Sequence, residues 1–381
     1  MAIDKITTAS ITDANITTAK LAYDAAPFRN IIINGDMSIA QRSTSVASIT
    51  GSGYNTVDRF STNILNMGTF TESQSTDVPT GQGFATSLKL DCTTADASPA
   101  AGDNIQFRQK VEAQNLQYLK FGTSSAESIT LSFWVKSVKT GTYIVELRHH
   151  DATKFISQSY TISSASTWEK KTLTFPGYTT TGFGNDNAAG LFINWWLGAG
   201  TNFTSGTLNT SWNSSVDANS AVGQVNLADS TSNEWYVTGV QLEAGTTASD
   251  FEFLPHDVNF ERCKRYFTIP VRSRGQDTPI ANGTMYTATD FYGVFEVGKG
   301  MRATPTLAFP TGTNFYGLVG NSNAGTFTGS TMSFGNITND GTCKTRIEVG
   351  SVANKVQGQG AWLRFEGATD TDDFISASSE L

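Results

Sequence analysis

Catalysis by histidine would have to use one of only three side chains, His149, His150 and His256. A Ser-His-Asp hydrolase needs a histidine general base beside a positioned serine, but the sequence contains no G-x-S-x-G nucleophile motif. His149 and His150 precede Asp151 at the end of a predicted strand, a position typical of a surface or rim role. The histidines therefore do not predict an active site.

Paired carboxylates are a second source of catalysis, because two of them can hydrolyse a glycosidic bond. Four acidic residues are candidates for such a pair: Asp186, Asp217, Asp229 and Glu234. Any β protein of this size has several carboxylates, and the sequence does not place two at the working distance. A polysaccharide depolymerase therefore stays open as an alternative, and we expect a protein that is not an enzyme.

Metal and cofactor patterns are absent from the sequence. There is no H-E-x-x-H or other zinc spacing, no P-loop and no G-x-G-x-x-G after a strand. The acidic segment 369–374 (TDTDDF) lacks the spacing and the glycine of an EF-hand loop, so we expect a solvated turn. Cys92, Cys263 and Cys343 lie far apart, which predicts buried thiols. We expect no metal, no cofactor and no catalytic residue.

Aromatic residues suggest sugar binding instead, because sugar C–H faces pack on aromatic rings while amide and carboxylate groups take the hydroxyls. Trp196 is expected on the strand face opposite Leu191, Ile193 and Trp195, and Trp212 lies in the polar segment LNTSWNSS. Three tyrosines lie in segments rich in Gly, Asn and Thr, typical of binding loops. The candidate sugar-binding residues are Trp196, Trp212, Tyr286, Tyr292 and Tyr316; core packing is the alternative for each.

Composition points to strands and turns. Charged residues make up 16% of the chain and glycine contributes 35 residues, with abundant Thr and Ser. A net charge of −8 without a basic patch argues against nucleic-acid binding. No apolar run approaches a membrane span, and the first residues, MAIDKITTAS, have neither the basic nor the apolar region of a signal peptide. We expect no membrane insertion and a chain made in a cytoplasm, although its composition resembles that of extracellular proteins.

Residues 27–255 predict one β domain. The segment SITLSFWVKS alternates, with Ile129, Leu131, Phe133 and Val135 on one face. Similar segments recur at GTYIVELRHH, STWEKKTLTFPG, GLFINWWLGAG and NEWYVTGVQLEAG, where Gly239 predicts a bulge. Short strands at this spacing favour an antiparallel jelly-roll β-sandwich.

Two short helices and a second β region are predicted beyond these strands. The first helix falls within residues 108–122. The second, within 256–267, follows Pro255, has Asp257 as a candidate cap and marks a domain junction. Residues 256–381 therefore comprise a linking helix and a C-terminal β tip domain, with strands at MYTATDFYGVFEV and KTRIEVGS.

Residues 1–26 carry an apolar residue at every fifth position: Ile6, Ile11, Ile16 and Leu21. A helix scatters this period around its axis, and a strand alternates it between faces. A lone chain cannot bury such a pattern, so we expect an extended assembly segment that is buried only against partners. A disordered tail in the free protein is the alternative.

Several motifs together resemble a known family. FRNIIINGDMSIAQR, followed by VDRF, and GVQLEAGTTASDFEFLPHDVNFERCKRYF resemble segments of bacteriophage tail-fibre and related virion receptor-binding proteins. The resemblance covers about 28–381, and its most specific part lies near 241–267. The middle of the chain is similar to carbohydrate-binding modules with a jelly-roll fold.

The resemblance implies a homotrimeric fibre protein of the virion tail that recognises a host surface polysaccharide. Residues 1–26 would contact other virion tail proteins. It implies no catalytic residue, and it carries over no sugar-contacting position. Three alternatives remain: a structural virion protein such as a head decoration or tail adaptor, a polysaccharide depolymerase, and a cellular carbohydrate-binding module.

Overall fold

A computed structural model describes residues 28–273, 277–311, 316–320, 323–327, 332–335, 344–350, 352, 355–365 and 373–381. The chain forms two compact units that divide between Pro255 and His256. Most of the regular secondary structure of the described residues lies in antiparallel sheets, which confirms the all-β prediction. The predicted assembly residues Ile6, Ile11, Ile16 and Leu21 lie outside the described residues.

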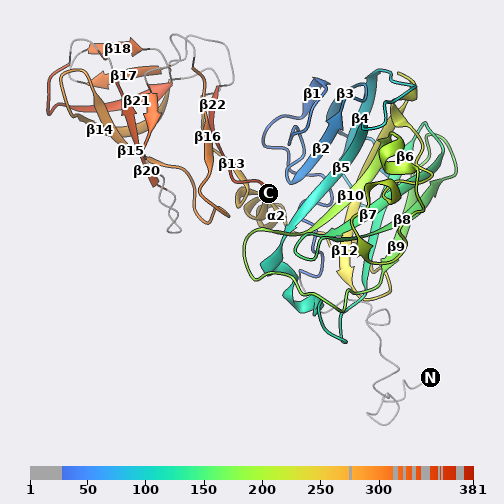
Figure 1. The fold of residues 1–381 in the computed structure, drawn as a ribbon. Helices are drawn as coiled ribbons and strands as arrows, with labels where there is room; N and C mark the ends of the chain where they lie inside the picture. Colours follow the sequence, from blue (N-terminus) through green and yellow to red (C-terminus); the bar gives the residue numbers. More distant parts are fainter. Residues whose placement is uncertain are drawn as a thin grey trace, which may run out of the picture. The chain divides into compact units, whose positions relative to one another are not determined.

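The N-terminal unit consists of two six-stranded sheets (Figure 1). The first has the order β1-β3-β4-β12-β6-β9, with bounds Ser45–Ile49, Thr69–Ser75, Ser87–Thr94, Glu234–Ala244, Ile129–Ser137 and Glu169–Phe175. The second has the order β11-β8-β7-β10-β5-β2, with bounds Asn213–Ser214, Lys154–Ile162, Gly141–His149, Ala189–Ala199, Asn104–Glu112 and Phe60–Leu65.

Alternating side chains from both sheets fill the core of this unit. The predicted inward residues of β6, Ile129, Leu131, Phe133 and Val135, are all fully buried. Phe133 meets Trp195 of β10 from the other sheet, with ring centroids 5.7 Å apart and the rings nearly perpendicular. The alternating hydrophobic residues in the sequence are therefore the ones that pack between the two sheets.

Gly239 forms the predicted bulge in β12. The register between β12 and β6 shifts between Thr238 and Gln241, and Gly239 has a φ of 61°. A Cβ at this position would lie 2.5 Å from the ring of Phe84. Both the backbone conformation and the packing therefore require glycine here.

Helices are short in this unit. The helix predicted within 108–122 is wrong over its first part, because β5 continues to Glu112 and only a 3-10 helix, η3 (Ala113–Leu119), follows. Within residues 28–255, the other helical segments are α1 (Thr201–Thr204) and the 3-10 turns η4 (Asp217–Asn219) and η5 (Leu227–Asp229).

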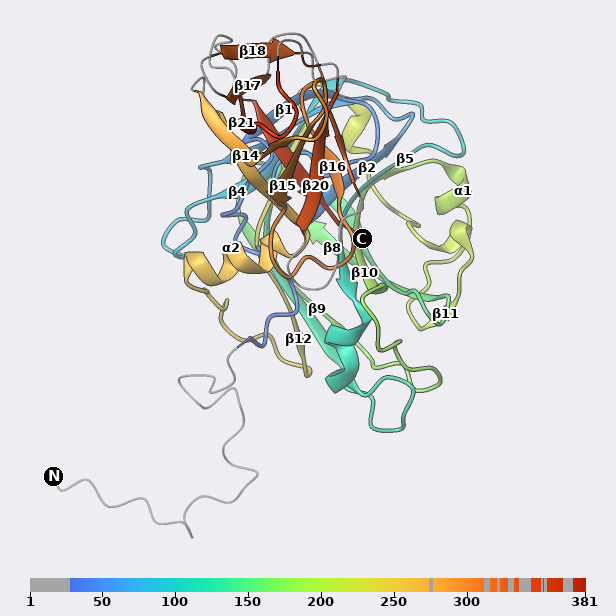
Figure 2. The same cartoon turned by 90° about the vertical axis from the view of Figure 1, so that its left-hand side faces the viewer.

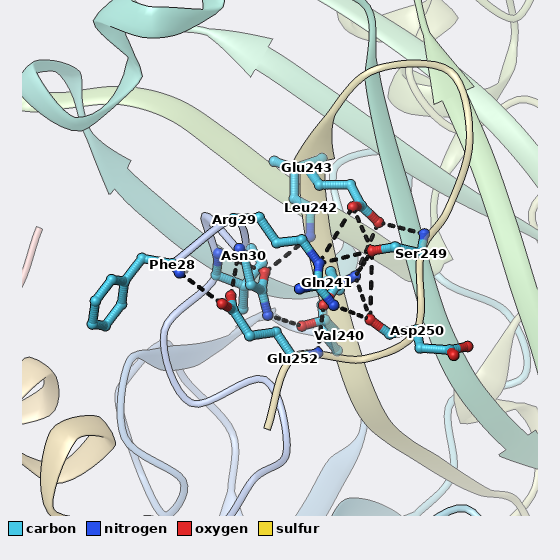
Figure 3. A network of polar contacts seen from close by, with 11 residues as sticks. Phe28, Arg29, Asn30, Val240, Gln241, Leu242, Glu243, Ser249, Asp250 and Glu252 are labelled. Carbon is cyan, nitrogen blue, oxygen red and sulfur yellow. Dashed lines mark hydrogen bonds and ion pairs between the residues drawn. The ribbon is translucent and has the colours of Figure 1, made fainter. Parts of the chain in front are cut away.

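A polar network joins the beginning of the unit to its end (Figure 3). The Asn30 side chain donates to the Val240 carbonyl at 3.1 Å and accepts from the amides of Ile32 and Leu242 at 3.0 and 3.1 Å. The carboxylate of Glu252 accepts from the amides of Phe28 and Asn30 at 2.6 and 2.9 Å.

Further contacts extend this network along β12. Arg29 donates to the Ser249 hydroxyl at 2.8 Å, and Ser249 donates to Glu243 at 2.6 Å. Gln241 accepts from the amide of Glu252 at 2.8 Å. The residues belong to the FRN and QLEAGTTASDFEF motifs of the sequence. Hydrogen bonds thus connect these two motifs, which are far apart in the sequence, so the motifs have a structural role.

The C-terminal unit begins with α2 (His256–Lys264) and continues in two sheets. The predicted helix is confirmed but ends at Lys264, and Phe267 already belongs to a strand. The three-stranded sheet has the order β13-β22-β16, with bounds Phe267–Arg272, Phe374–Ser378 and Thr306–Ala308.

The second sheet of this unit has seven strands (Figure 2). Its order is β18-β17-β21-β14-β15-β20-β19, with bounds Asn323–Phe327, Tyr316–Gly320, Gly360–Phe365, Thr278–Met285, Phe291–Glu296, Lys344–Val349 and Met332–Phe334. The segment MYTATDFYGVFEV was expected as one strand. It instead contains the turn between β14 and β15, since Met285 ends one strand and Phe291 begins the next.

Among the helices of the described residues, none has the length and apolar character needed to cross a membrane.

Candidate functional site

Two of the predicted tyrosines form an exposed stack on the C-terminal unit. Tyr286 lies in the turn after β14 and Tyr292 on β15; their ring centroids are 4.5 Å apart and their planes differ by 3°. The side chain of Tyr286 is 60% exposed. Because Tyr292 covers one face of this ring, the exposure belongs to the other face and the edge.

The β14–β15 turn holds Tyr286 in place through its backbone. Its amide donates to the Asp290 carbonyl at 2.8 Å, and its own carbonyl accepts from the Gln357 side chain at 3.2 Å. The hydroxyl of Thr287 donates to the Asp290 carboxylate at 2.5 Å, which closes the turn. Tyr286 therefore rests on a fixed backbone, although its ring is exposed.

Strand alternation on β15 points Tyr292 outward. Phe291 and Phe295 are buried in the core of the unit, while Tyr292 is half-buried and Val294 is 65% exposed on the other face. Val294 lies opposite Asn282 of β14 on one side and Arg346 of β20 on the other. The hydrophobic core therefore fixes which side chains reach this outer surface.

The outer surface of these strands combines aromatic, amide and cationic groups. The guanidinium of Arg346 lies 4.8 Å from the centroid of the Tyr292 ring and pairs with Glu348. Trp362 of β21 is half-buried and lies opposite Asn282 in register. We call this surface the aromatic face and define it by six residues: Asn282, Tyr286, Tyr292, Val294, Arg346 and Trp362.

Four of these residues were not among the sequence candidates: Asn282, Val294, Arg346 and Trp362. The alternation of Thr345, Ile347 and Val349 in KTRIEVGS already places Arg346 on the outward side of its strand. The six-residue strand GAWLRF gives a comparable signal for Trp362. Neither signal indicates which other strands lie beside it, so the face becomes visible only in the assembled sheet.

Two other predicted platforms are wrong because their side chains are buried. Trp196 does lie on the face of β10 opposite Trp195, but it has 0% exposure and packs against Ile144, Ala221 and Phe203. Residues that follow β10 in the chain cover this part of the sheet. Tyr316 is also fully buried, stacks on Phe365 at 5.2 Å and donates to the Pro310 carbonyl at 2.9 Å.

Trp212 occupies an intermediate position. It is half-buried against the core of the N-terminal unit, and its Nε1 donates to the Pro176 carbonyl at 2.6 Å. Its ring meets Phe121 edge-on, with centroids 5.9 Å apart. These contacts fix Trp212 as a packing residue at the margin of the sandwich, where part of the ring remains accessible.

The histidines lie in unlike surroundings. His149 is buried, stacks on Phe183 at 4.1 Å, and its Nε2 lies 3.0 Å from the Thr181 carbonyl. Burial lowers the pKa of His149 and outweighs the opposing contact with the Thr181 carbonyl. His150 is exposed and stacks on Phe192, and His256 is exposed at the start of α2.

The candidate carboxylates are mostly engaged by cations. Asp229 pairs with Lys139, and Asp217 lies 3.8 Å from Arg148. Burial opposes ionisation of Glu234, but hydrogen bonds from Lys89 and Tyr236 outweigh it and lower the pKa of this carboxyl. A glycosidase acid needs the opposite shift, so Glu234 is poorly suited to that role.

Possible metal-binding side chains do not cluster in the described part of the chain. In the part of the chain that the structure describes, no three His, Cys, Asp or Glu side chains gather into a possible metal site. The predicted acidic turn at 369–374 falls largely outside that part, which includes only Asp373 and Phe374 of the segment.

Comparison with known proteins shows no family from sequence: no protein-family model matches the chain, and no curated protein matches it. Solved structures show similarity over about half of the chain. A tailspike domain of bacteriophage CBA120, described as enzymatically active, is 15% identical with a TM-score of 0.29; the match covers 57% of this chain and 22% of that one.

Two smaller proteins match over nearly their whole length. A Bacteroides thetaiotaomicron protein described as sugar-binding is 12% identical with a TM-score of 0.31, covering 56% of this chain and 99% of that one. A family 11 carbohydrate-binding module of a Clostridium thermocellum cellulase is 12% identical with a TM-score of 0.25, covering 53% and 99%. The chain thus spans less than a quarter of the tailspike domain.

Proposed function

We propose that this protein is a bacteriophage tail-fibre protein that recognises a host surface polysaccharide. In this proposal, residues 1–26 attach the protein to other virion tail proteins, and the aromatic face meets the glycan. The exposed ring of Tyr286, held against Tyr292 beside the cationic side chain of Arg346, is the observation that carries the proposal.

The aromatic face has the parts that sugar recognition requires. An exposed aromatic ring offers an apolar surface to the C–H side of a pyranose, and stacking on Tyr292 limits its movement before binding. The Arg346 guanidinium can donate to ring oxygens and hydroxyls. Asn282 is exposed and adds both an amide donor and an acceptor. An exposed sheet surface with these groups suits an extended polysaccharide better than a small enclosed ligand.

The sequence motifs support the virion assignment. The FRNIIING and QLEAG…SDFEF segments resemble tail-fibre proteins, and the network of Figure 3 explains why the two occur together. The five-residue repeat of 1–26 favours a segment that is buried against partners. We infer a homotrimer, in which three weak sugar sites act together on one surface.

The test is binding of the full-length protein to an array of bacterial surface polysaccharides, combined with an assay for released reducing ends. We expect retention on specific polysaccharides without release of ends. Tyr286→Ala should weaken binding by about tenfold, the loss of one aromatic contact of ~1 kcal/mol or slightly more. Tyr286→Phe should bind nearly as well as the wild type.

Tyr118→Ala is the matched control, because Tyr118 is an exposed tyrosine of the N-terminal unit. It should bind like the wild type. Equal binding by the Tyr286→Ala and wild-type proteins would remove the aromatic face from the proposal. A folded protein that binds no surface polysaccharide would favour a structural virion role, and release of reducing ends would favour a depolymerase.

A further inference from the structure

A second group of polar residues lies on the N-terminal unit, on the outward side of the sheet that contains β5, β10 and β7. Arg108 of β5 lies opposite Asn194 of β10, which lies opposite Glu146 of β7. Their sequence neighbours Phe107, Trp195 and Val145 are buried in the core between the sheets. Strand alternation therefore sends Arg108, Asn194 and Glu146 to the other side.

The carboxylates of this group are already engaged. Arg148 donates from Nε to Glu146 at 2.5 Å, and its Nη2 lies 3.8 Å from Asp217. The Asn194 amide also donates to Glu146, at 3.0 Å. One arginine thus takes both acidic side chains, and Glu146 is fully buried beneath it.

Arg108 has no acidic partner in this group, because Arg148 pairs with both acidic side chains. Among the described residues it forms no ion pair; its Nη2 donates to the neutral Gln106 side chain. Its Nε is buried and has no hydrogen-bond partner in that part of the chain. The Oδ1 of Asn194, a residue only 1% exposed, is likewise without a partner there. Leaving such groups unsatisfied is costly. Asn194 is too buried to contact a ligand, so the half-buried Arg108 is the member of this pair that a ligand can reach.

Electrostatics favour a negative ligand at this position. Burial lowers the pKa of Arg108, and the nearby charge of Arg148 adds to the effect, against the opposing attraction of Glu146. An incoming anion would relieve this repulsion between the two arginines. A single unpaired guanidinium calls for a single negative charge, and its planar donors match a carboxylate.

We propose that this surface binds an acidic sugar of a polysaccharide, with the half-buried Arg108 donating to the sugar carboxylate. This deepens the proposed function by naming the class of glycan, and it rests on that function for the statement that the ligand is a polysaccharide. The site belongs to the N-terminal unit and shares no residue with the aromatic face.

The test is calorimetric titration of the full-length protein with three acidic probes: oligogalacturonate, hyaluronan oligosaccharide and oligosialic acid. Methyl-esterified oligogalacturonate is the neutral control, since it keeps the rings and removes the charge. We expect at least one acidic probe to bind and the ester to bind at least about tenfold more weakly, as for a lost charge-assisted contact.

Substitutions assign the binding to Arg108. Arg108→Gln should lower affinity for the acidic probe by about tenfold or more. Arg108→Lys should restore only part of the affinity, because lysine keeps the positive charge but lacks the planar pair of N–H donors of a guanidinium. Lys120→Gln removes the same charge from an exposed position of this unit and should leave affinity unchanged. Thermal unfolding of each variant confirms that it is folded.

Two results would overturn the inference: none of the acidic probes binds, or Arg108→Gln binds them as well as the wild type does. Tyr286→Ala separates this failure from failure of the proposed function. If Tyr286→Ala weakens polysaccharide binding and Arg108→Gln does not alter it, the aromatic face stands and the acidic-sugar site is rejected.

Discussion

His149 shows at the residue scale how burial changes the role of a titratable group. Its ring is enclosed by Phe121, Tyr178 and Phe183, with centroids 5.9, 5.7 and 4.1 Å away. Burial lowers its pKa, so the folded state favours the neutral imidazole. A group placed this way stabilises the fold above its unfolded pKa of about 6.5 and loses that contribution as the pH falls.

We therefore predict that the free energy of unfolding decreases between pH 7 and pH 5 and that His149→Phe flattens this dependence. The phenylalanine keeps the ring packing and cannot be protonated. Urea unfolding at several pH values would measure it. His150→Phe, at the exposed neighbour, should keep the wild-type slope. A His149→Phe slope equal to that of the wild type would show that another group causes the pH dependence.

Three carboxyl groups with lowered pKa values titrate below the pH range of this measurement. The pKa values of Asp77, Glu169 and Glu234 are lowered: burial raises each, but hydrogen bonds from Lys136, Lys171 and Lys89, respectively, outweigh it. Their stabilising effect is present above the ordinary carboxyl pKa and is lost at a more acidic pH. These three carboxyl groups therefore contribute little to a change in stability between pH 7 and pH 5.

At the scale of elements, the bulge of β12 gives a direct test of strand geometry. Gly239→Ala combines a positive φ with a Cβ 2.5 Å from the Phe84 ring, so we expect a loss of about 1–3 kcal/mol. Gly223→Ala is matched for φ, at 87°, with no atom within 4 Å, and should cost less. Denaturant unfolding compares them, and equal losses would show that φ alone matters.

The network between residues 28–30 and β12 predicts a second loss of stability. Asn30→Ala removes three hydrogen bonds and leaves the Val240 carbonyl and the Leu242 amide without their partner. We expect a cost of about 1–3 kcal/mol, or a fall in Tm of roughly 2–4 °C per kcal/mol. Asn213→Ala, at an exposed asparagine, should leave Tm nearly unchanged, and a similar Tm for both variants would contradict a structural role for the motif.

Local alternation made the strands of the sandwich predictable, including β6, β10 and the Gly239 bulge. The candidate site was harder to predict from the sequence, because the exposure of a side chain depends on segments that are distant in the chain. The outward direction of Trp196 was correct, yet Ala221 and Phe203 cover it. Tyr286 and Tyr292 were candidates separately, but their contact requires the β14–β15 turn. Arg108 gave no signal, since its lack of an ion pair depends on what Arg148 binds.

At the scale of the whole molecule, the proposed glycan site at the aromatic face is an exposed surface, and such a site binds single chains weakly. A fibre compensates through multivalency, because binding of the first site raises the local concentration of the others. The proposed homotrimer is therefore part of the binding argument. The resemblance to tail-fibre proteins implies three chains, and the repeat at Ile6, Ile11, Ile16 and Leu21 supports an assembly segment, because one chain alone cannot bury it.

We predict that native mass spectrometry of the full-length protein gives a mass of three chains, and that a variant lacking residues 1–26 dissociates more readily. The trimer should bind an immobilised polysaccharide about a hundredfold more tightly than a monovalent oligosaccharide. Ile11→Ser with Ile16→Ser should reproduce the deletion, whereas Thr8→Ser should not. A full-length monomer that binds both ligands with equal affinity would contradict the trimer and favour a monomeric carbohydrate-binding module.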